Sequence, residues 1–372
     1  MRRIVIVGCG VVGAAIAYEV SRYPAFEVTV VDRAAPASGS TAAALGIAMA
    51  VSSQRVKGRN WRLRQQSLDR YQSLLPELES LTGQPIGRNT EGIVTLCFEA
   101  DTLTRWRSLQ DHRQRQGYRL EIWSPAQVSD RCPHLNLGEA LGAVYSAQDF
   151  QVNPGQLTQA LVTAARLHGA NFILGEAVEG FQTIPAYPGQ RCTAVHSPSR
   201  SYAADAVVLA AGLGTLPLTQ YLQTPLALGP VLGQGARLEL PQPLGYPDFQ
   251  PVINGHDRHL VPLGQGSYWV GATVEFPPTQ SLSSLANLVP QADQLDQVIA
   301  GVTAYCPGLA AAQVSDRWFG LRPRPQHQAA PVIQPLEGFT NIWLATGHYR
   351  NGVLLAPATA LEICDRLVKA LT

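Results

Sequence analysis

A glycine-rich turn near the start of the chain constrains the fold more than any other feature. Residues 3–7 form a largely apolar, β-branched run that leads into Gly8, Gly10 and Gly13 and then into the helix-forming run 14–20. A buried strand, a tight turn and a helix in this order build a phosphate-binding unit. Gly8 permits the turn, Gly10 lets a pyrophosphate approach the backbone, and Gly13 lets the helix lie close to the strand. The alternative is a chance cluster of glycines.

A second strand favours the phosphate-binding interpretation over chance. Residues 27–31 are a further β-like run, and they end in Asp32. An acidic residue about 20 positions beyond the glycines is where a ribose hydroxyl is bound in dinucleotide sites. The sequence therefore predicts a dinucleotide-binding unit at the N-terminus.

Composition limits the remaining classes. The 372 residues, 46% of them hydrophobic, suit two domains with substantial cores. A net charge of +1 provides no global field for nucleic acid or an acidic membrane, so we expect small-molecule partners and no nucleic acid. The six cysteines are scattered and form no Cys-x-x-Cys pair, which indicates reduced thiols. The apolar stretch 42–51 is shorter than the about 20 residues that span a bilayer, and a cytoplasmic location is expected.

The segment after Asp32 is small and rich in hydroxyl groups. Ser40 and Thr41 precede a run of alanines, so we expect a helix to begin there and to face a second phosphate. The alternative is an alanine-rich helix that serves only packing.

Two groups of arginines and lysines lie on or beside expected helices at 60–81 and 102–117. The absence of interleaved aromatic residues favours solvated helix faces over a nucleic-acid site. The first group is Arg55, Lys57, Arg59, Arg62, Arg64 and Arg70, and the second is Arg105, Arg107, Arg113, Arg115 and Arg119.

The order of helical and β-like segments predicts two interleaved domains. A β-like run at 92–98 begins the second domain, and Asn153 with Pro154 caps a helix that returns to the first. The Gly- and Pro-rich alternation at 229–301 predicts an antiparallel sheet. Expected strands also lie at 171–174, 177–178, 206–212 and 341–346, with a final helix at 357–371. The expected domains are 1–84, 146–218 and 318–372 for cofactor binding, and 85–145 and 219–317 for substrate.

Five motifs occur in an order similar to that of FAD-dependent amine oxidoreductases, and the resemblance is greatest to glycine oxidase and D-amino-acid oxidase. They are the Gly8/Gly10/Gly13 unit with Asp32, the segment 40–44, the strand end Ala210-Ala211-Gly212, the run 320–325 (Gly-Leu-Arg-Pro-Arg-Pro) and the run 347–352 (Gly-His-Tyr-Arg-Asn-Gly). The resemblance covers nearly the whole chain. It implies an α/β fold in which a Rossmann-like FAD domain is interleaved with an α+β substrate domain.

The resemblance also implies roles for individual residues. Arg322 would clamp the substrate carboxylate, in keeping with the forked geometry of a guanidinium, although it could instead be a buried ion-pair partner. Arg350 would approach the flavin or the carboxylate, and the helix expected at Pro357 would turn its positive end to the flavin. The implied FAD contacts are Gly8, Gly10, Val11, Val12, Gly13, Asp32, Arg33, Ser40, Thr41, Ala42, Ala43, Val178, Ala211, Gly212, His348, Tyr349, Arg350, Asn351, Gly352 and Val353.

Two departures from the family pattern bear on the substrate. The positions at which glycine oxidases usually carry Tyr and Arg are His259 and Leu263 here. An imidazole titrates near pH 6.5, so His259 in the pocket would add a step to the pH profile of activity. No cysteine lies near Gly320, so non-covalent FAD is expected. His256 and His259 lack a third ligand, and no metal is expected.

The implied reaction is oxidation of the C–N bond of a small amino acid or secondary amine, such as glycine, sarcosine or a D-amino acid, to an imine. Oxygen is the expected acceptor, giving hydrogen peroxide. A dehydrogenase that passes electrons to a quinone or carrier, a nicotinamide enzyme and a non-catalytic flavin-binding protein are the alternatives. The sequence leaves the oligomeric state open, including a homo-oligomer.

Overall fold

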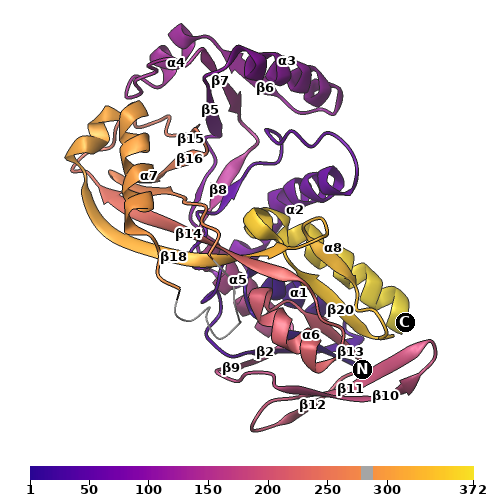
Figure 1. The fold of residues 1–372 in the computed structure, drawn as a ribbon. Coiled ribbons are helices and arrows are strands. Elements are labelled where there is room, and N and C mark those ends of the chain that lie inside the picture. Colours follow the sequence, from indigo (N-terminus) through magenta and orange to yellow (C-terminus); the bar gives the residue numbers. More distant parts are fainter. Residues whose placement is uncertain (278–287) are drawn as a thin grey trace.

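The computed structural model describes residues 1–277 and 288–372. Its first lobe is built on a six-stranded sheet that is parallel except for β19 at one edge (Figure 1). In spatial order the strands are β19 (Val332–Pro335), β20 (Ile342–Thr346), β13 (Ala206–Leu209), β1 (Arg2–Val7), β2 (Phe26–Asp32) and β9 (Asn171–Leu174). This is the Rossmann-like arrangement that the glycine-rich turn predicts.

Alternate side chains of the central strand, β1, pack into two different hydrophobic cores. Ile4 and Ile6 pack among helices on one face, whereas Val5 and Val7 pack on the other. The helices of the first face are α1 (Val11–Ser21), α2 (Arg59–Thr82), α5 (Pro154–Leu167) and α8 (Gly352–Leu371). The second face is covered by α6 (Thr215–Tyr221) and a three-stranded sheet of β10 (Gly180–Ala186), β11 (Gly189–His196) and β12 (Ser201–Ala203).

The second lobe contains an eight-stranded sheet in which only the β15–β5 pair is parallel. Its order is β18 (Gln313–Pro325), β14 (Leu228–Glu239), β17 (Ser267–Gly271), β16 (Arg258–Gly264), β15 (Val252–Gly255), β5 (Ile93–Cys97), β7 (Gly142–Ser146) and β6 (Leu120–Trp123). The lobe also holds α3 (Ala100–Arg115), α4 (Pro125–Arg131), α7 (Ala292–Tyr305) and η3 (Pro307–Ala311). Figure 1 shows the long strands β14 and β18 leading from this sheet toward the first lobe.

A third, small sheet is made of three short strands from separate parts of the chain. It consists of β3 (Ile47–Ala48), β8 (Phe150–Val152) and β4 (Arg88–Asn89). The helices expected at 60–81 and 102–117 are confirmed as α2 and α3, and Asn153 caps α5 by accepting a hydrogen bond from the Gln156 amide at 3.1 Å.

The last helix begins five residues earlier than expected, because Pro357 lies inside it. α8 begins at Gly352, and Pro357 supplies no N–H for the carbonyl of Val353. The Tyr71 hydroxyl donates to that carbonyl at 2.6 Å, and the Ser67 hydroxyl accepts from the Ala358 amide at 3.2 Å. Helix α2 thus supplies a donor for the carbonyl that the proline leaves unpaired and also bonds the amide after the proline, and α8 continues through Pro357.

Two other local expectations are wrong. Residues 36–43, including Ser40 and Thr41, form successive turns rather than the start of a helix, because their side chains bond to neighbouring elements and not to a new helix. Residues 177–178 lie in irregular backbone after β9, since the sheet ends at Leu174.

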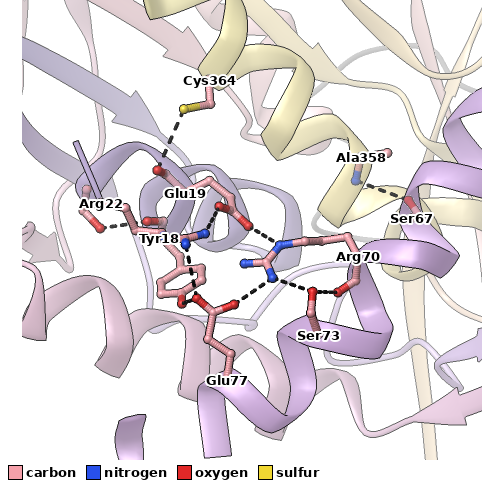
Figure 2. A network of polar contacts seen from close by, with 10 residues as sticks. Tyr18, Glu19, Arg22, Ser67, Arg70, Ser73, Glu77, Ala358 and Cys364 are labelled. Carbon is pink, nitrogen blue, oxygen red and sulfur yellow. Dashed lines mark hydrogen bonds and ion pairs between the residues drawn. The ribbon is translucent and has the colours of Figure 1, made fainter. Parts of the chain in front are cut away.

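Arg70 is not on a solvated helix face. Figure 2 shows its guanidinium bonded to Glu19 on α1 and Glu77 on α2. Both contacts are 2.7 Å long, and the Arg70 side chain is 11% exposed. The Tyr18 hydroxyl also donates to Glu77, at 2.6 Å. The network ties α2 to α1, and it explains why a basic residue occupies this inward position.

Arg113 is likewise buried, in contrast to the expectation of solvation. It follows Trp106 and Leu109 at helical spacing, so it shares their inward face of α3. Its guanidinium lies 3.6 Å from the centroid of the Trp61 ring and donates to carbonyls of residues 51, 53 and 55. Asp149 accepts from the amides of residues 50–52, so two buried charges fix the loop that joins β3 to α2.

Candidate active site

The glycine-rich turn has the shape that a dinucleotide phosphate requires. Gly8 has a φ of +109°, and a Cβ on Gly13 would lie 1.9 Å from the Gly8 carbonyl oxygen. A Cβ on Gly10 would meet only the Thr41 hydroxyl, at 3.2 Å, so this position stays open on its other sides. The N-cap of α1 is Gly10 and makes no side-chain capping bond. An open backbone at a helix N-terminus fits the pyrophosphate of FAD.

Asp32 lies at the carboxyl end of β2, beside this turn. Its carboxylate accepts from the Cys9 amide at 2.5 Å and the Ala34 amide at 2.9 Å, and its own carbonyl accepts from Glu176. The segment that contains Val178 therefore leaves the sheet next to Asp32. Val178 is partly buried against the second core of the lobe.

The turns at 36–43 pack between α1 and β18. Thr41 accepts from the Val11 amide at 3.1 Å, and Ser40 donates to the Leu321 carbonyl at 2.5 Å. A Cβ on Gly320 would lie 2.4 Å from the Cβ of Ala43, and this close approach explains the glycine. The segment thus joins the glycine-rich turn to the strand that carries Arg322.

The strand end 210–212 approaches the same turn. A Cβ on Gly8 would meet backbone atoms of Ala210 and Ala211 at 2.7 Å, so the close approach of this strand end requires a glycine at position 8. Gly212 has a φ of +58° and begins η1 (Gly212–Gly214), and its carbonyl accepts from Thr346 at 3.1 Å.

The turn at 347–352 includes η4 (Tyr349–Asn351) and leads directly into α8. The His348 imidazole bonds Thr359 on α8 at 2.9 Å, and burial lowers its pKa to about 3. The imidazole is therefore neutral at ordinary pH, and the bond to α8 holds it in place. Arg64 on α2 donates to the Asn351 side chain at 3.1 Å, which fixes the turn from the opposite side.

Arg322 has no carboxylate within ion-pair distance among the described residues. One terminal nitrogen of its guanidinium, Nη1, donates to the carbonyls of Leu232 and Thr273, at 3.1 Å each. The guanidinium covers Gly233, where a Cβ would lie 2.1 Å from its Nη2 atom. Burial, more than the nearby Arg350, lowers its pKa from the ordinary value. The alternative role as a buried ion-pair partner finds no support here.

His259 lies on β16 opposite Gly271 of β17 and is 7% exposed. Burial lowers its pKa to about 4, although Asp257 acts in the opposite direction. An imidazole with this pKa stays neutral from pH 5 upward. The step in the activity profile that an ordinary imidazole would give near pH 6.5 is therefore expected near pH 4 instead.

Arg350 and Asp257 form a two-point ion pair that the sequence did not indicate. Their contacts are Nη1 to Oδ2 at 2.8 Å and Nη2 to Oδ1 at 2.7 Å. The pair raises the pKa of Arg350 above its ordinary value. Partial burial opposes ionisation of Asp257, whose side chain is 58% exposed, but Arg350 outweighs it and the pKa of the carboxyl is lowered.

The remaining residues singled out in the sequence are not among the contacts described above. Leu263 is 37% exposed, and all six cysteines are buried and free. His256 stacks on Phe98 with ring centroids 3.7 Å apart, away from the His259–Gly271 contact. The parts of the chain that the structure describes contain no group of three or more potential metal ligands. Across the same residues no helix is long and apolar enough to cross a bilayer.

The sheet order and the open backbone at Gly10 define a two-lobe protein of the dinucleotide-binding class. Comparison with known proteins gives the family. Residues 3–366 match the family DAO, described as FAD dependent oxidoreductase, and the chain belongs to it. Its cofactor is accordingly FAD, as the resemblance implied.

Relatives and solved structures cover essentially the whole chain. The bifunctional protein ThiO/ThiG of Synechocystis sp. is 32% identical over 98% of this chain and 51% of its own length. The glycine oxidase of Geobacillus kaustophilus is 28% identical over 97% of this chain and 92% of its own. The crystal structure of glycine oxidase from that organism superposes with a TM-score of 0.86 at 25% identity, covering 100% of this chain and 96% of the other. The chain spans about half the length of the bifunctional relatives.

Proposed function

We propose that this protein uses FAD to oxidise the C–N bond of a small amino acid or secondary amine, such as glycine, sarcosine or a D-amino acid. The product is an imine, which water hydrolyses, and the proposed electron acceptor is oxygen, which becomes hydrogen peroxide. The proposal is supported by the glycine oxidase relatives, which align over nearly all of this chain. The bound flavin would supply hydride acceptance from the substrate carbon.

The single observation that carries the proposal is the state of Arg322. Its guanidinium is partly buried, anchored by two backbone carbonyls and free of any ion-pair partner in the described chain. A cation desolvated in this way favours binding of an anion, and its remaining N–H groups match the two oxygens of a carboxylate. Arg322 therefore binds and orients the substrate carboxylate.

His259 contributes shape and hydrogen bonding without charge. Because its pKa is lowered to about 4, it does not compete with Arg322 for the carboxylate and is not protonated at neutral pH. No protein base is required if the substrate binds as the free amine, since no proton then has to be removed from nitrogen before the carbon is oxidised.

The proposed position of the cofactor rests on the same residues. We propose that FAD contacts the glycine-rich turn with Asp32 and Arg33, residues 40–43, Val178, Ala211, Gly212 and residues 348–353. The domains proposed are 1–84, 146–218 and 318–372 for FAD, and 85–145 and 219–317 for substrate. The two sheets support this division, with β18 crossing the boundary at residue 318. The buried free thiols support a cytoplasmic location.

Anaerobic mixing of the holoenzyme with glycine, sarcosine, proline and D-amino acids tests the proposal. Loss of the yellow flavin absorbance with at least one of them is expected, followed by rapid recovery when oxygen is admitted. Recovery only with a quinone would assign the dehydrogenase alternative. Bleaching by no amine would leave a non-catalytic flavin-binding protein and would refute the proposal.

A further inference from the structure

Arg350 and Asp257 join two segments that are far apart in the chain. Arg350 lies in η4, directly before α8, and Asp257 lies in the turn between β15 and β16. Both terminal nitrogens of the guanidinium contact both oxygens of the carboxylate, so the fork that could bind a second carboxylate is occupied. A two-point pair of this kind also fixes the orientation of both side chains.

This ion pair lies beside the proposed carboxylate site. Asp257 is two residues before His259, and the Gly271 that pairs with His259 is two residues before Thr273, whose carbonyl anchors Arg322. The charges of Arg350 and Asp257 also act on the pKa of Arg322, in opposite directions. The pair and Arg322 therefore belong to one electrostatic neighbourhood.

The other charged side chains near Arg322 already have partners within the protein. Arg324 lies over the rings of Phe276 and Tyr349, at 5.4 and 5.9 Å from their centroids. Glu275 is buried and accepts from Gln234 at 2.8 Å. Of the guanidinium groups in this neighbourhood, only Arg322 is without a carboxylate or aromatic partner among the described residues.

We propose that Asp257 determines specificity by engaging Arg350, so that the site accepts amino acids and amines with one carboxylate and rejects those with a second. The inference rests on the proposed function and specifies its substrate class. With Asp257 in place, a second carboxylate meets an occupied guanidinium and a repelling negative charge. Without it, Arg350 becomes a second anion-binding group.

The test uses binding as well as turnover. Methoxyacetate and oxydiacetate are the ether analogues of sarcosine and iminodiacetate, and neither has a C–N bond to oxidise. Their dissociation constants are measured from the change in flavin absorbance of the holoenzyme, for the wild type and for Asp257→Asn, Asp257→Glu and Asp257→Asn/Arg350→Gln. Asp296→Asn is the matched control, because Asp296 forms an exposed pair with Arg317 elsewhere in the same lobe.

We expect the wild type to bind methoxyacetate at least tenfold more tightly than oxydiacetate. Asp257→Asn should reduce that ratio at least tenfold, mainly by tighter binding of oxydiacetate, while Asp257→Glu and Asp296→Asn keep it. The double variant should not bind oxydiacetate more tightly than the wild type, because the guanidinium that Asp257→Asn frees is absent. A ratio that stays within twofold of the wild type in Asp257→Asn would overturn the proposal, and so would a gain that persists in the double variant.

Sarcosine and iminodiacetate are then compared as reductants of the flavin. Because the ether analogues report binding alone, a wild type that no amine reduces would refute the proposed function while the specificity of Asp257 is still measured. Conversely, a wild type that sarcosine bleaches and that binds both ethers equally would retain the function and overturn the role of Asp257.

Discussion

Replacing Arg322 by alanine tests the proposed carboxylate site directly. A guanidinium carries five N–H donors, and in this structure Nη1 supplies both contacts to the carbonyls of Leu232 and Thr273. Nη2 and Nε remain to bind the two carboxylate oxygens. Loss of one partner of a desolvated, charge-assisted pair costs about 2–5 kcal/mol. At about 1.4 kcal/mol per tenfold, Arg322→Ala should weaken substrate binding by roughly 30- to 4000-fold.

The assay measures both the KM of the amine substrate and the dissociation constant of methoxyacetate, together with the FAD content of each variant. Arg322→Lys should fall between the wild type and Arg322→Ala, because an ammonium keeps the charge but not the fork. Arg317→Ala is the control, since Arg317 lies on the same strand but pairs with Asp296 at the surface. Near-normal binding by Arg322→Ala with full FAD content would refute the reasoning.

Three further predictions concern stability and the cofactor. Burial lowers the pKa values of His259 and His348 to about 4 and 3, so the unfolded chain binds protons first as the pH falls below about 6.5. Each of the two histidines should lower the free energy of unfolding by about 2 kcal/mol between pH 7.5 and pH 5. A thermal midpoint no lower at pH 5 than at pH 7.5 would contradict this. Tyr71→Phe should cost about 1–3 kcal/mol in thermal unfolding by leaving the Val353 carbonyl buried and unpaired, whereas Tyr187→Phe, at a 99% exposed position, should cost nothing measurable. Acid or heat should release all the yellow chromophore, because no cysteine lies near Gly320, and colour that stays in the precipitate would disprove non-covalent binding.

Features determined by neighbouring residues were predictable from the sequence. The glycine-rich turn, the Asn153 cap and the antiparallel character of the second sheet all follow from local pattern and are confirmed. The β-like region expected at 229–301 extends too far, because residues 292–301 belong to α7, and residues 278–287 lie outside the described part of the chain. The buried position of Arg113 also had a signal, because Trp106 and Leu109 precede it at helical spacing. Charge alone was a poor guide to the position of Arg113, since a guanidinium can be buried when it donates to carbonyls and packs on an aromatic ring.

The wrong start of α8 has a different cause. A proline usually marks the first turn of a helix because it lacks an N–H, and this rule placed the start at Pro357. Two side chains of α2 bond this part of α8: Tyr71 donates to the Val353 carbonyl that the proline leaves free, and Ser67 accepts from the Ala358 amide. Both lie nearly 300 residues away in the chain. Local sequence contains no information about such partners, so the tertiary contact overrides the local rule.

The Asp257–Arg350 pair could not be predicted from the sequence. The motif alone leaves Arg350 free to approach the flavin or the substrate carboxylate. Its partner lies 93 residues earlier, in a hairpin turn that becomes a neighbour only because β15 and β16 extend the sheet next to β17. The net charge of a binding site is therefore set by the order of strands as much as by the residues of its motifs. A chain with the same motifs but without an acidic residue at this turn is expected to present two guanidinium groups instead of one.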